Sequence, residues 1–204
     1  MRREGRIFDT AAAEIAPLVT KGVAEFGLTI MAAGNEQLST EPLFTEDYLL
    51  VCPADHPLGN RREIRWSEIG DENLIRVSAQ TANRFIVDQA LGGESEQKNW
   101  RYEVQHTLTA LRLVRTGVGL TVMPRCAVEA LNDKAVSYSP LTRPKVTRTI
   151  GILSRRGVPL SMLAQSFRAC LLSTSGAKKR GRSKPRIPPA ASRTPRRIRQ
   201  VSVR

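Results

Sequence analysis

The stretch RTGVGLTVMPR, residues 115–125, contains two closely spaced glycines, a pattern found both in phosphate-binding loops and at helix ends. In a dinucleotide-binding loop the glycines follow a strand and open a helix, whose N-terminus holds the phosphate. Here the order is reversed. Leu108, Leu111 and Val114 recur at helical spacing before the glycines, and the apolar run 120–124 that follows them has the character of a buried strand.

The two glycines therefore predict a helix end rather than a nucleotide site. We expect Gly117 to adopt the left-handed conformation that ends many helices. We expect Gly119 to let the chain turn tightly into the strand. The third glycine of the dinucleotide fingerprint is also missing, which further disfavours a nucleotide site.

Length and composition indicate an ordinary soluble domain. The 204 residues, 41% of them hydrophobic, allow one domain or two small lobes with a real core. No run approaches the roughly 20 apolar residues that span a bilayer, and the charged N-terminus lacks the pattern of a signal peptide. Cys52, Cys126 and Cys170 are widely spaced and odd in number, which favours free thiols and a cytoplasmic location.

The net charge of +13 is concentrated in the last residues. Residues 176–204 hold eleven Lys and Arg and no acidic residue, whereas the rest of the chain holds 21 basic and 19 acidic residues, a net charge of +2. We expect this basic tail to be disordered, because it has too little apolar surface to bury. It either binds nucleic acid non-specifically through phosphate contacts or has no role.

Strands and helices alternate along the rest of the chain, which predicts an α/β fold with a mostly parallel sheet. We expect strands within 5–10, 22–30, 48–53, 74–77, 101–105, 120–124, 135–141 and 147–154, and helices at 11–19, 83–91, 107–115, 127–131 and 160–172, with a helical opening at the start of the segment 66–78.

Three segments together carry a resemblance to a known family. They are GVAEFGLTI at 22–30, LSTEPLFTEDYLLVCPADHPL at 38–58 and VQHTLTALRLVRTGVGLTVMP at 104–124. Their order and spacing resemble the effector-binding domain of LysR-type transcriptional regulators of bacteria. The resemblance covers roughly residues 6–172.

The resemblance implies a fold like that of periplasmic binding proteins. Two α/β lobes would be joined by two crossover strands, near 52–55 and 148–153, with a small-molecule pocket between the lobes. Lobe one would combine residues 1–53 with 151–175, and lobe two would comprise residues 54–150. The resemblance also implies that the chain forms homo- or hetero-oligomers with LysR-type subunits.

The chain departs from the family at its start. Family members begin with a winged helix-turn-helix, and only about six residues precede RIFDT here. We therefore expect the first lobe to be incomplete at its N-terminus, and we expect no sequence-specific DNA binding by this chain alone.

Polar residues that follow the predicted strands are the candidates for effector contacts. Open α/β sheets bind ligands at the carboxyl ends of their strands, and the N-terminus of a following helix favours an anion. The alternative is that these residues only cap helices or carry surface charge. The candidates for binding a small, anionic organic effector are Ser78, Thr81, Arg84, His106, Thr107 and Met123.

Catalysis, metal binding and a cofactor have little support. No Gly-x-Ser-x-Gly elbow presents a serine nucleophile, and neither His56 nor His106 has a cysteine or carboxylate at metal-like spacing. We therefore expect no enzyme activity and no cofactor or metal. The leading interpretation is the ligand-sensing module of a transcriptional regulator. The alternatives are a stand-alone small-molecule-binding protein of the periplasmic type and a non-specific nucleic-acid binder acting through the tail.

Overall fold

The computed structural model describes residues 5–31, 36–78 and 82–180. Most of the expected helices and strands are confirmed within two residues of their ends. The helices are α1 (Ala12–Thr20), α2 (Ala82–Leu91), α3 (Thr107–Arg115), α4 (Arg125–Leu131) and α5 (Met162–Arg180), with short 3-10 turns η1 (Trp66–Ile69) and η2 (Gly92–Ser95). The strands are β1 (Phe26–Ile30), β2 (Leu38–Pro53), β3 (Ile64–Arg65), β4 (Leu74–Val77), β5 (Trp100–Val104), β6 (Leu120–Pro124), β7 (Val136–Thr142) and β8 (Thr147–Arg155).

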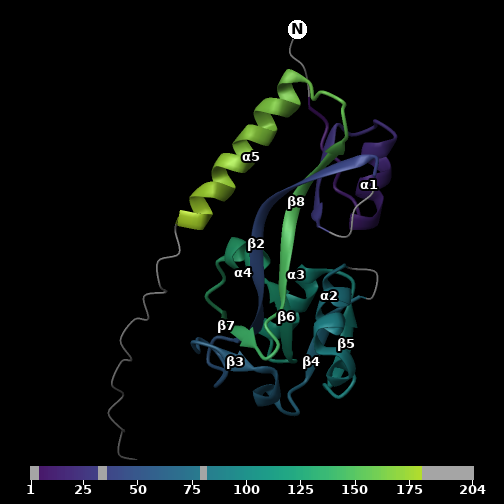
Figure 1. Cartoon of the computed structure of the whole chain (residues 1–204). Helices are drawn as coiled ribbons and strands as arrows, with labels where there is room; N and C mark the ends of the chain where they lie inside the picture. The colour runs from purple at the N-terminus through teal and green to yellow at the C-terminus, as the bar shows by residue number, and fades with distance from the viewer. Residues whose placement is uncertain (1–4, 32–35, 79–81, 181–204) are drawn as a thin grey trace, which may run out of the picture.

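The long strand β2 joins the two parts of the molecule (Figure 1). The main sheet has the order β1-β8-β2-β6-β4-β5, and β7 pairs with both β2 and β3. From Leu38 to Asp47, β2 pairs with β8, and from Tyr48 onward it pairs with β6 and β7. The change of partner therefore lies upstream of the first crossover predicted at 52–55, and the second predicted crossover falls inside β8. The division into two lobes stays a prediction.

The sheet is mixed, so the prediction of a mostly parallel sheet was wrong. Strands β4, β5 and β6 are parallel to one another and are connected through α2 and α3, as parallel strands require. In contrast, β2 is antiparallel to each of β6, β7 and β8. The direction of the strands was missed because an apolar run has the same composition whether the strand pairs in parallel or antiparallel with its neighbour.

Two ends of the chain also differ from expectation. No strand forms at 5–10, where Ile7 is 81% exposed and no neighbouring strand pairs with the segment. Helix α5 continues to Arg180, beyond the predicted end at 172, so the first five residues of the predicted disordered tail are helical. Their Ala, Lys and Arg residues are good helix formers. Residues 181–204 lie outside the described part of the chain.

The core lies mainly on the two faces of the lower sheet in Figure 1. In β2, Tyr48, Leu50 and Cys52 pack on one face with Trp66, and the alternating residue Val51 packs on the other face under α3. This double burial explains why the second half of β2 is a nearly continuous apolar run. The upper part has a much smaller cluster, formed by three buried residues, Val19, Leu38 and Leu153.

The Gly-Val-Gly segment ends α3 as predicted, but the two glycines act differently. Gly117 has φ of +75°, the left-handed conformation expected after a helix. At Gly119 the reason is close contact, because a Cβ there would lie 2.5 Å from the carbonyl oxygen of Asn73. The same oxygen accepts a hydrogen bond from the Leu120 N–H, 2.8 Å away. The predicted buried face of α3 also shifts, since Leu108 is 48% exposed and Ala110 is buried.

Candidate functional site

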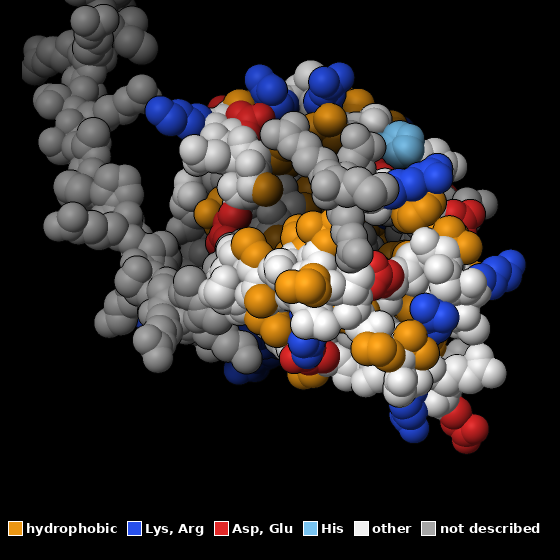
Figure 2. All heavy atoms as spheres, turned by 90° about the horizontal axis from the view of Figure 1, so that it is seen from above, with side chains coloured by type: hydrophobic (Ala, Val, Ile, Leu, Met, Phe, Trp, Pro, Cys, Tyr) orange, Lys and Arg blue, Asp and Glu red, His pale blue; other side chains and the backbone are white. Residues whose placement is uncertain are grey.

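An open cleft of about 630 Å³ lies between the upper and lower parts of the molecule. Its lining combines residues of α1, β1, β2, β8 and α5 with the first residues of α2 and α4. Ligand-binding clefts usually have a volume of about 300 to 1,000 Å³. The cleft is therefore large enough for a small organic molecule. Seen from above, hydrophobic side chains are spread over the surface and most Lys and Arg lie near its edge (Figure 2).

A buried ion pair lies at one end of the cleft, called the polar end because Asn83, Cys126 and Arg148 line it. Arg148 on β8 lines the cleft, and its Nε and Nη2 lie 2.8 and 2.7 Å from Oε1 of Glu46 on β2. The two side chains are only 11% and 5% exposed. The other carboxylate oxygen of Glu46 accepts a hydrogen bond of 2.6 Å from the backbone N–H of Cys126. The pair therefore connects β2, β8 and the start of α4.

Asn83 connects this ion pair to α2. Its Oδ1 accepts hydrogen bonds from Nη1 of Arg148, at 2.7 Å, and from the hydroxyl of Tyr48, at 2.8 Å. Burial raises the pKa of Tyr48 to about 12, so the hydroxyl stays protonated and remains a donor. Burial lowers the pKa of Arg148, but its hydrogen bond to Glu46 and the charge of Glu46 outweigh this effect and leave that pKa raised. The guanidinium is therefore always charged.

The thiol of Cys126 belongs to the same cluster. Its Sγ lies 3.2 Å from Oε1 of Glu46 and 3.5 Å from Nη2 of Arg148. Burial raises the pKa of the Cys126 thiol, and the hydrogen bond to Glu46 and the negative charge of Glu46 raise it further. Because the thiolate is the reactive form of cysteine, this thiol is held in its unreactive state.

We predict that Cys126 reacts slowly with iodoacetamide at pH 8. Cys170 is exposed, whereas Cys126 is half-buried and has a raised pKa. Cys126 should be alkylated at least about ten times more slowly than Cys170, because its thiolate fraction is lower. Mass spectrometry of peptides after timed quenching measures both rates in one sample, and buried Cys52 is the internal control for an inaccessible thiol. Equal rates at Cys126 and Cys170 would contradict the geometry of the cluster.

The six residues selected from the sequence are not brought together in this cleft. Ser78 is 5% exposed, and its backbone N–H donates to the carbonyl of Val104 at 2.8 Å. His106 precedes α3 without a side-chain cap hydrogen bond, and Thr107 is the first residue of α3 rather than its cap. Thr81 lies outside the described residues. The lining of the large cleft includes none of the five that are described.

Three of the selected residues meet in a second, much smaller hollow. Arg84, Thr107 and Met123 line a space of about 30 Å³ between α2, α3 and the sheet. Such a space holds roughly one water molecule. It is therefore too small for an organic effector in this conformation.

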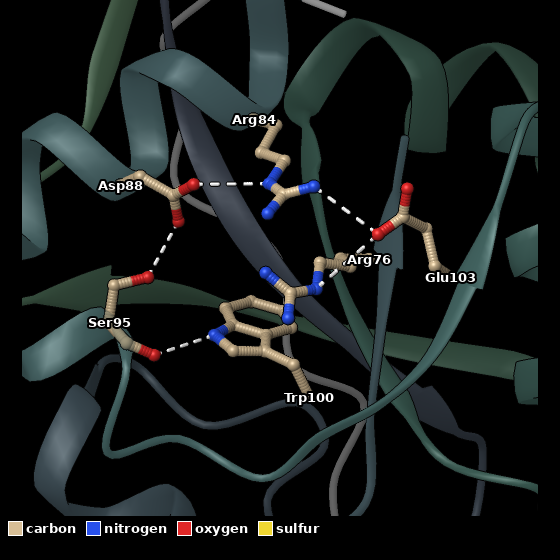
Figure 3. Close-up of polar contacts among 6 residues, drawn as sticks. All are labelled: Arg76, Arg84, Asp88, Ser95, Trp100 and Glu103. Carbon is tan, nitrogen blue, oxygen red and sulfur yellow. Dashed lines mark hydrogen bonds and ion pairs between the residues drawn. The ribbon is translucent and has the colours of Figure 1, made fainter. Parts of the chain in front are cut away.

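Arg84 is held within a network of charged residues on the lower part of the molecule (Figure 3). Its Nε lies 3.2 Å from Asp88, and its Nη1 lies 3.2 Å from Glu103. Glu103 also contacts Nε of Arg76 at 3.8 Å, and the guanidinium of Arg76 lies over the ring of Trp100. Two carboxylates therefore compensate the charge of Arg84, and its contact with Glu103 links α2 to β5.

Glu46, Arg148 and Cys126 were missed in the sequence reasoning. Arg148 lies inside the predicted strand 147–154, Cys126 lies two residues after the predicted strand 120–124, and Glu46 lies two residues before the predicted strand 48–53. The available signal was a charged or polar residue inside or next to an apolar strand. The ion pair joins residues that are 102 positions apart in sequence. A single sequence gives no indication of such a contact.

The described residues offer no obvious metal site or membrane span. Within 5–31, 36–78 and 82–180, no group of three or more His, Cys, Asp or Glu is arranged to hold a metal ion. In the same part of the chain, no helix combines the length and the apolar character that a bilayer crossing requires.

Comparison with known sequences identifies the family of this chain. The sequence model described as "LysR substrate binding domain" matches residues 6–176. The uncharacterized HTH-type transcriptional regulator YbhD of Escherichia coli (strain K12) is 31% identical over 150 residues, which are 74% of this chain and 47% of YbhD. The transcriptional dual regulator OxyR of the same strain is 33% identical over 145 residues, which are 66% of this chain and 46% of OxyR. The chain thus spans about half the length of the curated relatives it matches.

Solved structures show the same fold. The reduced form of OxyR superposes with a TM-score of 0.64 at 23% identity, covering 84% of this chain and 79% of the chain in that structure. The effector-binding domain of QuiR in complex with shikimate gives a TM-score of 0.68 at 19% identity, covering 83% of this chain and 80% of the chain in that structure. The regulatory domain of Synechocystis PCC6803 CcmR in complex with 2-PG gives a TM-score of 0.68 at 15% identity, covering 81% of this chain and 80% of the chain in that structure. The curated relatives YbhD and OxyR are transcriptional regulators.

Proposed function

Because the chain belongs to the LysR substrate binding domain family, we propose that it is the ligand-sensing module of a LysR-type transcriptional regulator. A small organic molecule binds between the two lobes and shifts their relative orientation. In the intact regulator this shift controls transcription. The transcriptional regulators among the relatives, and the neighbours solved with shikimate and with 2-PG, support this proposal.

The cleft of about 630 Å³ is the observation that carries the proposal. It lies where β2 changes its pairing partner, so its walls come from both parts of the molecule. We place the boundary between the lobes at Asp47 and Tyr48 on β2, and at the start of β8 on the return. A ligand in this position contacts both lobes and favours one orientation over another.

The polar end of the cleft is the proposed contact for the ligand's head group. Asn83 and Arg148 line it with donor groups, and Ala82 and Asn83 form the start of α2, where a helix favours negative charge. Ser78 stays a candidate because it directly follows β4 and precedes the start of α2 by four residues. Arg84 acts indirectly in this proposal, by holding α2 in place.

Sensing of hydrogen peroxide, which the names of several relatives mention, is not part of the proposal. Burial is the main cause that raises the pKa of both Cys52 and Cys126. A raised pKa lowers the fraction of reactive thiolate. Cys170 is exposed on α5 and does not belong to the cluster of Glu46, Arg148 and Cys126.

Assembly with LysR-type subunits and a cytoplasmic location complete the proposal. A stand-alone binding protein and a non-specific nucleic-acid binder remain the competing functions. Salt dependence separates the nucleic-acid binder, because phosphate contacts release counterions and weaken steeply as salt rises. Binding of a small ligand in the cleft involves few counterions.

We predict that a ligand of the cleft raises the melting temperature of the chain. At a concentration of about 100 times Kd it adds about 2.7 kcal/mol to the free energy of unfolding, which corresponds to about 5 to 10 °C for a domain of this size. Differential scanning fluorimetry with a panel of organic acids and neutral analogues measures the shift.

Two alanine variants test where such a ligand binds. Asn83→Ala, in the cleft, should reduce the shift, whereas Asn99→Ala should leave it unchanged, because Asn99 is exposed and contacts Asp71 and Asn73. Equal loss in both variants would argue against the cleft. A cooperative transition that no compound in the panel moves would argue against ligand sensing.

A further inference from the structure

The walls of the cleft are apolar. They come from α1, β1, β2 and β8, and include Ile15, Leu28, Ile30, Leu43, Phe44 and Ile150. The other lining residues are Ala, Leu, Thr and Ser, apart from Asn83, Cys126 and Arg148 at the polar end. A ligand that fills the cleft therefore buries most of its surface against hydrocarbon side chains.

Arg148 is the single charged side chain among the described residues that line the cleft. Its charge is already compensated, because Nε and Nη2 both contact Oε1 of Glu46. Its Nη1 donates to Asn83, so each of the three guanidinium nitrogens already contacts a protein group. The polar end therefore offers hydrogen-bond donors but no unpaired positive charge.

The charge balance limits which ligands fit. A ligand with two or three negative charges would place at least one of them against apolar walls, and burying an uncompensated charge is very costly. One negatively charged group is the most that fits, because a single position brings it close to the hydrogen-bond donors of Arg148 and Asn83 and to the start of α2. A neutral acceptor such as a carbonyl or hydroxyl is accommodated there as well.

We infer that the effector is an apolar molecule, aromatic or branched aliphatic, with one polar head that carries at most one negative charge. Its body lies between α1 and the strands β1, β2 and β8, and its head lies against Arg148 and Asn83. This inference rests on the proposed function and names the chemical class for the same cleft. It differs from a hydroxylated ring such as shikimate, which the solved QuiR domain binds.

Fluorescence titration with 1-anilinonaphthalene-8-sulfonate tests the inference directly, because this probe has an aromatic body and one negative charge. The full chain should bind it saturably with one strong site. Unlabelled competitors at matched ionic strength then define the class. 1-Naphthoate should displace the probe at a concentration at least tenfold lower than shikimate or citrate.

Two variants of α1 form a matched pair for locating the probe. Ala11→Asp introduces a carboxylate into the lining of the cleft, at the N-cap of α1, where Asp is a favourable residue. Ala13→Asp introduces the same charge two residues later, at an exposed position that does not line the cleft. Ala11→Asp should raise the Kd of the probe at least tenfold, and Ala13→Asp should leave it within twofold.

The outcomes separate this inference from the proposed function. If shikimate or citrate raises the melting temperature more than 1-naphthoate does, the cleft senses ligands but the inferred class is wrong. If Ala11→Asp leaves probe binding unchanged, the apolar cleft does not hold the probe and the inference falls. If neither the probe nor any competitor binds, both the inference and the ligand-sensing function are contradicted.

Discussion

Replacing Arg148 by methionine is expected to lower the free energy of unfolding by about 3 to 5 kcal/mol. The substitution removes the partner of Glu46, whose side chain is only 5% exposed, and leaves its charge buried and uncompensated. It also removes the hydrogen bond from Nη1 to Asn83, so the start of α2 loses one contact with β8. Urea unfolding followed by circular dichroism measures the loss.

Two controls identify burial as the cause of this loss. Arg168 and Glu41 form an ion pair between α5 and β2, but their side chains are 40% and 39% exposed. Arg168→Met should therefore cost less than about 1 kcal/mol. The double variant Arg148→Met/Glu46→Gln removes the buried charge and should recover part of the stability. An equal loss in the Arg148 and Arg168 variants would show that burial is not the decisive factor.

Gly119→Ala is expected to destabilise the chain by about 2 kcal/mol or more, because the new methyl group is forced into the backbone. Its Cβ would lie 2.5 Å from the carbonyl oxygen and 3.2 Å from the carbonyl carbon of Asn73. Relief requires β6 to move away from the residue that precedes β4, and these two strands are neighbours in the sheet. Chemical denaturation at 25 °C measures the change.

Two other glycines provide the comparison. At Gly93 an added Cβ meets nothing within 4 Å and φ is not positive, so Gly93→Ala should lie within about 0.5 kcal/mol of the natural chain. At Gly117 the space is also open, but φ is +75°, so Gly117→Ala should cost about 1 kcal/mol from backbone strain alone. If Gly119→Ala behaved like Gly93→Ala, the close contact with Asn73 would be wrong.

Local patterns along the chain were enough to predict much of the fold. The segment from η1 to β6 was predicted nearly residue by residue, because apolar spacing, glycines and Pro124 mark each boundary. The order of these elements also supported the resemblance to LysR-type effector-binding domains, which the family match over residues 6–176 confirms. Information of this kind lies within short windows of sequence.

Features that depend on distant residues were missed. The first half of β2 contains Pro42 and several acidic residues. It forms a strand because β8 supplies hydrogen-bonding partners that are at least 100 positions away. Glu46 looked like part of an acidic lead, although its partner Arg148 makes it a buried residue. Arg84 was selected as a ligand contact for its charge, but Asp88 and Glu103 compensate that charge.

The unbroken course of β2 from Leu38 to Pro53 has a mechanical consequence. No loop interrupts this strand where its partner changes from β8 to β6 and β7, so no flexible joint is available to absorb a rotation. A rotation of one lobe relative to the other must therefore twist β2 itself. Glu46 lies near the middle of this strand, one residue before the last residue that pairs with β8, and its ion pair with Arg148 joins the two strands at that point.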